Sequence, residues 1–167
     1  MANQDSQILQ KYRDLYKKEL HENVLPFWLN HSLDREFGGY FNNLDRDGKV
    51  YDKTKQMWLQ GRQVWMMSRL YNQFHEEKYL EAAKLGAEFL RHYGRDGDRV
   101  YFSLTREGKP HFMQRKMFSE CFYVMALAEY GRAAEDASAT REARELLNLI
   151  FEYAKDPTLV GRPVFEG

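Results

Sequence analysis

The sequence predicts an all-α fold with short β-hairpins, its helices arranged in an inner and an outer layer. Apolar residues recur at helical spacing through five segments, and two of these segments are apolar on nearly every side. A glycine-containing turn precedes each of those two segments. A helix that is apolar all round must be enclosed by other helices, whereas a one-sided helix faces solvent. The two kinds of helix therefore predict two layers.

Composition narrows the class of protein. The 167 residues are 43% hydrophobic, enough for a core, and 25 basic residues balance 25 acidic ones, so the sequence offers no basic face to nucleic acid or to an anionic membrane. Cys121 is the only cysteine, which excludes an internal disulfide and fits a reducing, cytoplasmic compartment. The longest apolar run is eight residues, far short of a membrane span, and the first residues lack the pattern of a signal peptide.

The first third of the chain predicts a long helix and then a hairpin. Residues 5–31 carry a one-sided apolar stripe, and Pro26 predicts a kink or an early end near Val24, because proline removes a helical hydrogen bond. Residues 40–52 alternate about the turn DRDG, with Gly48 expected in the left-handed conformation.

The remaining segments repeat this order of helix, hairpin and helix. We expect helices over 55–74, 77–93, 115–134 and 140–154, with a second hairpin over 99–113 that turns at TREG. Gly94 ends the helix over 77–93, and Pro157 closes the last helix. The tail after Pro157, LVGRPVFEG, has no periodicity.

An internal repeat relates the two hairpins. Aligning their turn glycines, Gly48 and Gly108, gives an offset of 60 residues, which places Arg46 on Arg106, Met57 on Met117, Trp58 on Phe118 and Trp65 on Met125. This period is too long for common two-helix solenoids but suits a unit of outer helix, hairpin and inner helix. Closed rings of helical hairpins fit it best.

Arg62 is the charged residue that stands out in the helix over 55–74. Trp58, Arg62 and Trp65 share one face at spacings i, i+4 and i+7, so the guanidinium is expected between two indole rings. A buried guanidinium needs a partner. Two interpretations stay open: a ligand is that partner, or Arg62 is a structural arginine paired with a carboxylate elsewhere in the fold.

Three segments together carry a resemblance to a known family. GGYFNNLDRDGKVYD, KQMWLQGRQVW and KMFSECFYVMALAEY resemble the N-terminal part of the N-acylglucosamine 2-epimerases, with the cellobiose 2-epimerases more distant. The resemblance implies an (α/α)6 toroid of about six hairpin units, of which this chain would hold fewer than three. Residues 1–167 are therefore expected to be the N-terminal portion of one toroid domain, apparently truncated.

The resemblance also implies a reaction. These enzymes interconvert N-acetylglucosamine and N-acetylmannosamine by removing and returning the C2 proton of the open-chain sugar, which needs two acid/base groups. Arg62 matches the family's arginine, which would meet the negative charge growing on the C1 oxygen. The family's two catalytic histidines lie beyond this sequence. Its own five histidines are expected in surface or capping roles, and the chain alone is expected to be inactive.

Three further residues are candidates for substrate binding. Trp58 flanks the arginine, and Phe118 and Glu120 lie in MFSECFY, where the family implies a sugar pocket. Core packing is the alternative for Phe118. Glu120, in an otherwise apolar helix, requires a partner, either substrate hydroxyls or Arg62 itself.

No metal site is expected. Residues 43–54 imitate a calcium loop, with Asn43, Asp45 and Asp47 at its first positions, but Thr54 replaces the bidentate glutamate at position 12, which indicates a turn. The chemistry needs no cofactor, and the resemblance leaves ATP open as a non-consumed effector. The expected partners are an N-acyl amino sugar and, as an open option, a second copy in a homodimer.

Two other functions compete with the epimerase. A glycoside hydrolase on the same ring of helices would need two carboxylates, and Glu120 is the only acidic residue placed inside an apolar inner helix. A non-catalytic module that binds a partner protein, as the renin-binding members of the family suggest, would not need Arg62 for proton chemistry.

Overall fold

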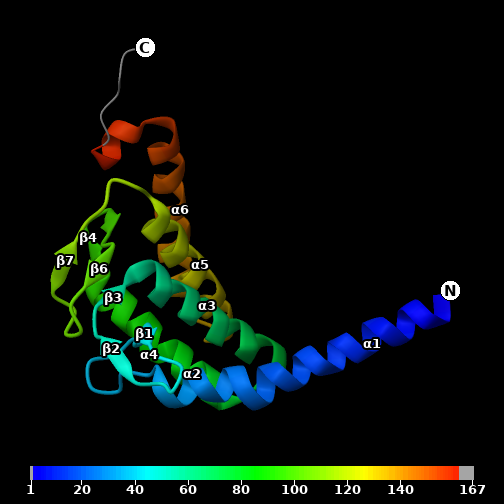
Figure 1. The fold of residues 1–167 in the computed structure, drawn as a ribbon. Coiled ribbons are helices and arrows are strands. Elements are labelled where there is room, and N and C mark those ends of the chain that lie inside the picture. The colour runs from blue at the N-terminus through cyan, green and yellow to red at the C-terminus, as the bar shows by residue number, and fades with distance from the viewer. Residues whose placement is uncertain (1, 162–167) are drawn as a thin grey trace, which may run out of the picture.

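The computed structural model describes residues 2–161 and is built mainly from helices (Figure 1). The α-helices are α1 (Ala2–Glu19), α2 (Leu25–His31), α3 (Met57–Phe74), α4 (Glu77–Tyr93), α5 (Phe118–Ala133) and α6 (Ala137–Lys155), with a π-helical turn, η1 (Leu20–Val24), and a 3-10 turn, η2 (Pro157–Val160). Within the described part of the chain, no helix is both long and apolar enough to cross a membrane.

Short antiparallel strands connect the helices. They form a first hairpin, β1 (Asn43–Leu44) and β2 (Val50–Asp52), a second, β4 (Arg95–Asp96) and β5 (Arg99–Val100), and a three-stranded sheet of β3 (Lys55–Gln56), β6 (Ser103–Leu104) and β7 (Pro110–Phe112) in the order β3-β6-β7. The β3–β6 pairing joins segments that are distant in the sequence, so it fixes the second half of the chain against the first.

The two predicted layers of helices are present. α3 packs against α5, while α4 packs on α3 and α6 packs on α5. The inner pair supplies much of the core, including Val64 and Met67 from α3 and Tyr123 and Leu127 from α5. Glycine permits the close approach of the inner pair, because a Cβ atom on Gly61 would lie 2.6 Å from the Phe122 carbonyl oxygen.

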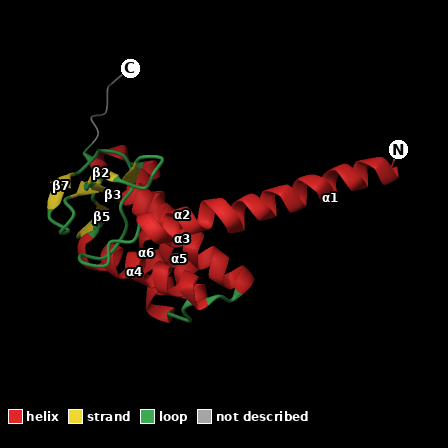
Figure 2. Ribbon diagram, turned by 60° about the horizontal axis from the view of Figure 1, so that its bottom comes forward, coloured by secondary structure: helices red, strands yellow, loops and turns green. Residues whose placement is uncertain are grey.

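The long first helix continues to His31, with the predicted disturbance near Val24. η1 precedes Pro26, which occupies the first turn of α2, and the widened turn accommodates a residue that lacks an amide hydrogen. α1 extends away from the other helices, as both views show (Figures 1 and 2). All its residues from Asp5 onward are exposed.

Several predicted boundaries were wrong by two or three residues. The helix expected from position 55 starts at Met57, because Lys55 and Gln56 are extended and pair with β6. The helix expected from 115 starts at Phe118. The last helix starts at Ala137, before the expected position 140, because the Asp136 carboxylate accepts the amide hydrogens of Ser138 and Ala139 and so caps its N-terminus.

The predicted second hairpin is two features. Arg99 and Val100 pair with Arg95 and Asp96 to form the extra hairpin, while the TREG turn joins β6 to β7. The two repeat turns share one geometry: Gly48 and Gly108 have φ values of 83° and 88°. The predicted left-handed glycine and the 60-residue repeat of the turns are confirmed.

Candidate functional site

Arg62 lies on the surface of α3, on an aromatic platform. Its guanidinium carbon is 5.3 Å from the centre of the Trp58 ring and 4.9 Å from that of Phe122, and the two rings are 6.0 Å apart. Cation–π attraction from two rings holds a guanidinium in a defined orientation while leaving its N–H groups available. The predicted pair of Trp58 and Arg62 is therefore present.

The second ring is not the predicted one. Phe122 of α5, and not Trp65, completes the platform, because α5 crosses α3 at Gly61, one residue before the arginine. Helix periodicity places residues on one face of a single helix, but it carries no information about the ring that a neighbouring helix brings.

A cavity of about 250 Å³ opens beside the guanidinium, between α3 and the segment formed by η1 and α2. Its wall is apolar apart from Arg62, Asn42 and Gln63, and consists of Leu20, Val24, Leu25, Trp28, Asn42, Leu59, Arg62, Gln63, Met66 and Met67. Asn42 is held in place because its Oδ1 accepts a hydrogen bond of 2.6 Å from Gln60. An apolar pocket with a few oriented polar groups is the usual form of a small-molecule site.

The charge of Arg62 is unpaired within residues 2–161. No carboxylate in this part of the chain forms an ion pair with it, and its side chain is exposed. The structural interpretation required a carboxylate partner, which the described residues do not supply. The guanidinium can therefore meet a negative charge from outside this part of the chain.

Phe118 is the first residue of α5 and is 60% exposed. An aromatic ring with that exposure does not belong to the core, so core packing is wrong as an account of Phe118 in this structure. Phe118 lies one helical turn before Phe122, which contacts Arg62. The two rings therefore fall on neighbouring positions of the same helix.

Glu120 is fully buried, and its partner is not Arg62. One carboxylate oxygen, Oε1, accepts from Arg99 Nε at 2.8 Å and from the Val100 amide at 3.1 Å. The other, Oε2, is buried without a partner among the described residues. The expectation that this glutamate needs a partner is met by Arg99, a residue that sequence spacing did not single out.

Gln60 occupies the corresponding place in the first repeat. Its Oε1 accepts the amide hydrogen of Tyr40 at 2.9 Å, just as Glu120 accepts that of Val100 sixty residues later. Both side chains connect an inner helix to the backbone shortly before the strand that leads into a repeat turn, β1 for Gln60 and β6 for Glu120. This shared position gives Glu120 a structural task that does not require substrate.

The histidines lie apart from Arg62, and none lines its cavity. His75 ends α3 in a left-handed conformation, with φ of 55°, which is a capping position. His31 packs against the first hairpin turn so closely that a Cβ atom on Gly48 would collide with its ring. His111 Nδ1 is 3.2 Å from Ser103 Oγ.

The segment that imitates a calcium loop is the turn of the first hairpin, as predicted. The Asp45 carboxylate accepts the amide hydrogens of Asp47 and Lys49, at 3.0 and 2.8 Å, so one of its oxygens is already engaged by backbone. Within residues 2–161, no three acidic, histidine or cysteine side chains gather in a geometry that would hold a metal ion.

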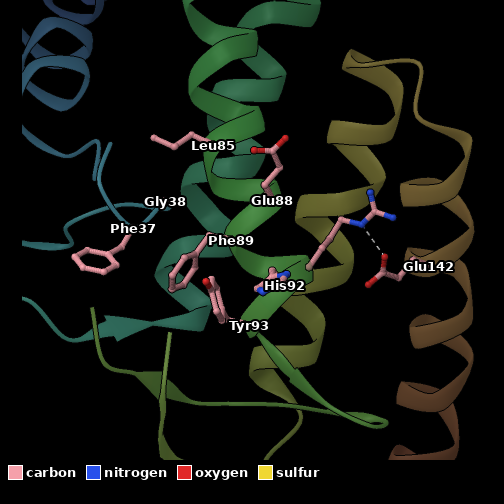
Figure 3. Close-up of a pocket in the computed structure, with 9 residues that line it drawn as sticks. Phe37, Gly38, Leu85, Glu88, Phe89, His92, Tyr93 and Glu142 are labelled. Carbon is pink, nitrogen blue, oxygen red and sulfur yellow. Dashed lines mark hydrogen bonds and ion pairs between the residues drawn. The ribbon is translucent and has the colours of Figure 1, made fainter. Parts of the chain in front are cut away.

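A larger cavity, of about 650 Å³, lies along α4 and is also lined by Phe37 and Gly38 and by Glu142 of α6 (Figure 3). Figure 3 shows Glu88 and His92 on α4 opposite Glu142 of α6. Its arginine, Arg91, is already paired with Glu142 at 2.9 Å, and none of the predicted site residues lines it. Its size does not make it the better candidate, because its one guanidinium is satisfied within the protein.

Two functional candidates escaped the sequence analysis. Asn42 and Gln63 join Arg62 in the cavity wall, although they come from a hairpin and from the helix position next to the arginine. The alternation of apolar and polar residues around the first hairpin did not indicate that Asn42 faces α3. The WLQGRQVW segment does contain Gln63, and its two glutamines flanking the arginine were the available signal.

Comparison with known sequences points to one family. Residues 39–162 match the family model described as N-acylglucosamine 2-epimerase (GlcNAc 2-epimerase). The N-acylglucosamine 2-epimerase of Bos taurus is 45% identical over 170 residues, and that of Homo sapiens is 43% identical; the alignments cover 98% of this chain and 40% of each relative. The chain therefore spans about two fifths of the length of these relatives.

Solved structures agree with the sequence matches. The cellobiose 2-epimerase from Bacillus thermoamylovorans superposes with a TM-score of 0.78 at 30% identity, over 84% of this chain and 37% of that one. The cellobiose 2-epimerase from Spirochaeta thermophila gives a TM-score of 0.78 at 28% identity, over 87% and 36%. These neighbours are (α/α)6 toroids, and the predicted partial toroid is confirmed.

Proposed function

The chain belongs to the N-acylglucosamine 2-epimerase family, and we propose that it forms the N-terminal part of an enzyme that interconverts N-acetylglucosamine and N-acetylmannosamine. The observation that carries the proposal is Arg62, an exposed guanidinium that is oriented by two aromatic rings beside a cavity and is unpaired within residues 2–161. A site that must stabilise an oxyanion requires a cation that remains protonated and is already oriented.

The reaction assigns Arg62 a definite task. A base removes the C2 proton of the open-chain sugar, negative charge moves onto the C1 oxygen, and a proton returns to the other face of C2. The guanidinium would donate hydrogen bonds to that oxygen and stabilise the enediolate. The two acid/base groups are supplied by histidines outside this sequence, which is the part of the proposal drawn from the family.

The surrounding side chains suit a sugar. Trp58 and Phe122 form an aromatic surface, and Asn42 and Gln63 carry amides at the edge of the cavity. Sugar rings pack on aromatic faces and bond amides through their hydroxyls. Phe118 can extend the aromatic surface, whereas Glu120 acts through Arg99 and the backbone.

The activity is tested in a completed ring. Residues 1–167 are joined to the part of the Bos taurus enzyme that extends beyond its match with this chain, and epimerisation of N-acetylmannosamine is followed by chromatography. Arg62→Lys keeps the charge but loses the planar fork, so kcat should fall about a hundredfold, the equivalent of about 3 kcal/mol. The matched control is Arg69→Lys, an exposed arginine on the same helix, which should leave kcat unchanged.

Two outcomes would count against the proposal. An unchanged kcat in Arg62→Lys would end the assignment of Arg62 to catalysis. Turnover by the 167-residue chain alone, in proportion to the amount of purified protein, would show that the acid/base groups lie within this chain. That result would overturn the proposal that histidines outside this sequence supply them.

A hydrolase is less well supported by the same site. Glycoside hydrolysis needs two carboxylates flanking one bond, and no carboxylate lines the cavity beside Arg62 among the described residues. The proposal includes no cofactor for the chemistry, a cytoplasmic location in keeping with the single cysteine, and ATP as a candidate effector taken from the family alone.

A further inference from the structure

Two amide side chains share the wall of the 250 Å³ cavity with Arg62. Asn42 reaches the cavity from the residue before β1, and Gln63 follows the arginine on α3. Both side chains are half-buried. An amide side chain has a donating end and an accepting end, so its contribution to a site depends on which end already has a partner. Backbone groups of the protein decide this for both residues.

Gln60 fixes the orientation of the Asn42 amide. Gln60 is fully buried; its Oε1 accepts the amide hydrogen of Tyr40 at 2.9 Å, and its Nε2 donates to the Tyr40 carbonyl at 2.7 Å. A backbone amide can only donate and a backbone carbonyl can only accept, so the Gln60 side chain has one possible orientation. Its Nε2 also lies 2.6 Å from Asn42 Oδ1, which accepts the second amide hydrogen. The amino group of Asn42 is therefore the end that remains for a ligand.

Ser32 fixes the orientation of the Gln63 amide in the same way. Ser32 is fully buried, and its hydroxyl donates its single hydrogen to the Trp28 carbonyl at 2.6 Å. Ser32 Oγ can then only accept, so Gln63 approaches it with the amino group, Nε2. The end of Gln63 that remains for a ligand is the oxygen, Oε1. Within residues 2–161, neither this oxygen nor the Asn42 amino group has a hydrogen-bond partner.

The cavity wall therefore has a defined hydrogen-bonding polarity. Arg62 and Asn42 offer donors, Gln63 offers an acceptor, and the remaining lining side chains are apolar. A secondary amide is complementary to such a wall, because its carbonyl accepts, its N–H donates and its alkyl end is apolar. A hydroxyl group also donates and accepts, but it does so through one oxygen and has no alkyl end. The wall therefore suits an acylamido group better than a hydroxyl group.

The proposed reaction brings a substituent of the sugar to the same place. Arg62 is assigned to the C1 oxygen, and C2, which exchanges its proton, is bonded directly to C1. A sugar whose C1 oxygen reaches the guanidinium must therefore hold its C2 substituent close by. Gln63 is the next residue of α3, and Asn42 lines the same cavity.

We propose that Asn42 and Gln63 select sugars with an acylamido group at C2. Asn42 donates to the acyl carbonyl, Gln63 accepts the N–H hydrogen, and the alkyl end lies against the apolar wall. This inference rests on the proposed function, because that function places the C1 oxygen at Arg62. It adds the residues that distinguish an acylamido sugar from a sugar with a hydroxyl group at C2.

Calorimetry with two open-chain alditols tests the selection. N-acetylglucosaminitol and glucitol differ only in the C2 substituent, and their binding is measured on the fusion of residues 1–167 with the Bos taurus remainder. The wild-type fusion should bind N-acetylglucosaminitol more tightly. Asn42→Leu and Gln63→Met keep the approximate size of each side chain but remove its polar atoms. Each should reduce the preference about tenfold, the effect of one lost hydrogen bond, while the affinity for glucitol stays the same.

Both variants leave the backbone contacts of their neighbours intact. Gln60 keeps the Tyr40 carbonyl when Asn42 is replaced, and Ser32 keeps the Trp28 carbonyl when Gln63 is replaced. The unchanged affinity for glucitol verifies that each variant is folded. The matched controls are Asn43→Leu and Gln73→Met, the same replacements at residues that do not line the cavity, and they should leave the preference unchanged.

Four outcomes would overturn the inference: a wild-type fusion without a preference for N-acetylglucosaminitol, cavity variants that keep the whole preference, control variants that lose as much of it, and an equal loss of affinity for both alditols. Epimerase activity is assayed separately. An inactive fusion that still shows the expected preference contradicts the proposed function and leaves the selection by Asn42 and Gln63 standing. An active fusion whose cavity variants keep the preference contradicts this inference alone.

Discussion

Gln60 and Glu120 occupy equivalent positions in two units, and both link an inner helix to a hairpin by accepting a backbone amide hydrogen. They differ in their second polar atom. Gln60 Nε2 donates to the Tyr40 carbonyl at 2.7 Å, whereas Glu120 Oε2 has no partner in the described part of the chain. The buried negative charge of Glu120 is instead balanced by the positive charge of Arg99. A buried charge with a single opposite charge beside it is destabilised strongly when that partner is lost.

The pair predicts an asymmetric response to substitution. Glu120→Gln keeps the acceptor for the Val100 amide and gains a donor like that of Gln60, so it should cost less than about 2 kcal/mol, roughly the loss of one ion pair. Glu120→Ala leaves that amide without a partner and leaves Arg99 with only the Gln114 carbonyl, to which its Nη2 donates at 2.8 Å, and should cost about 3 to 5 kcal/mol. Urea unfolding of both variants measures the difference. Equal losses would contradict the shared role.

Sequence reasoning identified Arg62 and Trp58 because both lie on one helix, where spacing fixes the face. It could not identify Phe122 or Arg99, because those contacts depend on how separate elements cross. The same limit applied to Glu120: its burial was foreseeable from the apolar run, but its partner came from another hairpin.

At the scale of elements, the close crossing of α3 and α5 depends on Gly61, which has no side chain. A Cβ at Gly61 would lie 2.6 Å from the Phe122 carbonyl oxygen, so the helices would have to separate. Separation would open the core between them and displace the ring that holds Arg62.

Gly61→Ala should therefore destabilise the chain by about 1 to 3 kcal/mol, although alanine ordinarily favours a helix over glycine by about 1 kcal/mol. The control is Gly97→Ala, where a Cβ meets nothing within 4 Å and only the left-handed φ of 55° opposes it, at a cost of about 1 kcal/mol. Thermal unfolding compares them, and a stabilised Gly61→Ala would contradict the close crossing.

The buried Asp34 carboxylate, which accepts from Arg106 and Lys55, predicts that the stability of the fold depends on pH in the acid range. Burial raises the pKa of Asp34, but hydrogen bonds from Arg106 and Lys55 outweigh it and hold that pKa below its ordinary value. The folded state therefore releases this proton more readily than the unfolded state does. The resulting stability is complete above the ordinary aspartate pKa, about 3.9, and is lost as the pH falls through the folded value.

Comparison with Asp34→Asn isolates this contribution. At neutral pH the wild type should be more stable by about 3 to 5 kcal/mol, and the gap should narrow as the pH drops below about 4. Asp98→Asn, at an exposed aspartate, is the control and should show a small gap at every pH. Chemical unfolding across the acid range measures both, and a gap that stays constant for Asp34 would contradict a stabilising role for its charge.

The bounds of a helix were predicted correctly where the sequence next to it contained both its apolar stripe and its stop signal. The helix over 77–93 was bounded correctly because a one-sided stripe ended at a glycine. The start of α3 was misplaced because Lys55 lies in a strand that pairs with β6 and forms a buried ion pair with Asp34, and neither contact can be read from the local sequence. The β4–β5 hairpin was missed because its strands are two residues long. Such strands are too short to show an alternation of apolar and polar residues in the sequence.

At the scale of the molecule, the described part of the chain has exposed apolar side chains on several elements. The most extensive part is α1, whose exposed apolar residues lie along one helix that projects from the body (Figure 1); they are Ile8, Leu9, Tyr12, Leu15 and Tyr16. Leu9 and Tyr16 are 71% and 69% exposed. Their spacing of seven residues places them on one side, two helical turns apart.

Most of the stability of a helix in a protein comes from packing its apolar face, and an exposed apolar stripe such as that of α1 usually marks a contact surface. We therefore expect the 167-residue chain to self-associate, with light scattering showing a mass that rises with concentration. Leu9→Glu combined with Tyr16→Glu should shift the chain toward monomer. Gln7→Glu combined with Gln10→Glu adds the same charge to α1 without removing apolar surface, and should leave association largely intact. A wild-type chain that stays monomeric at high concentration, or control variants that dissociate as readily, would show that the stripe on α1 is not what holds copies together.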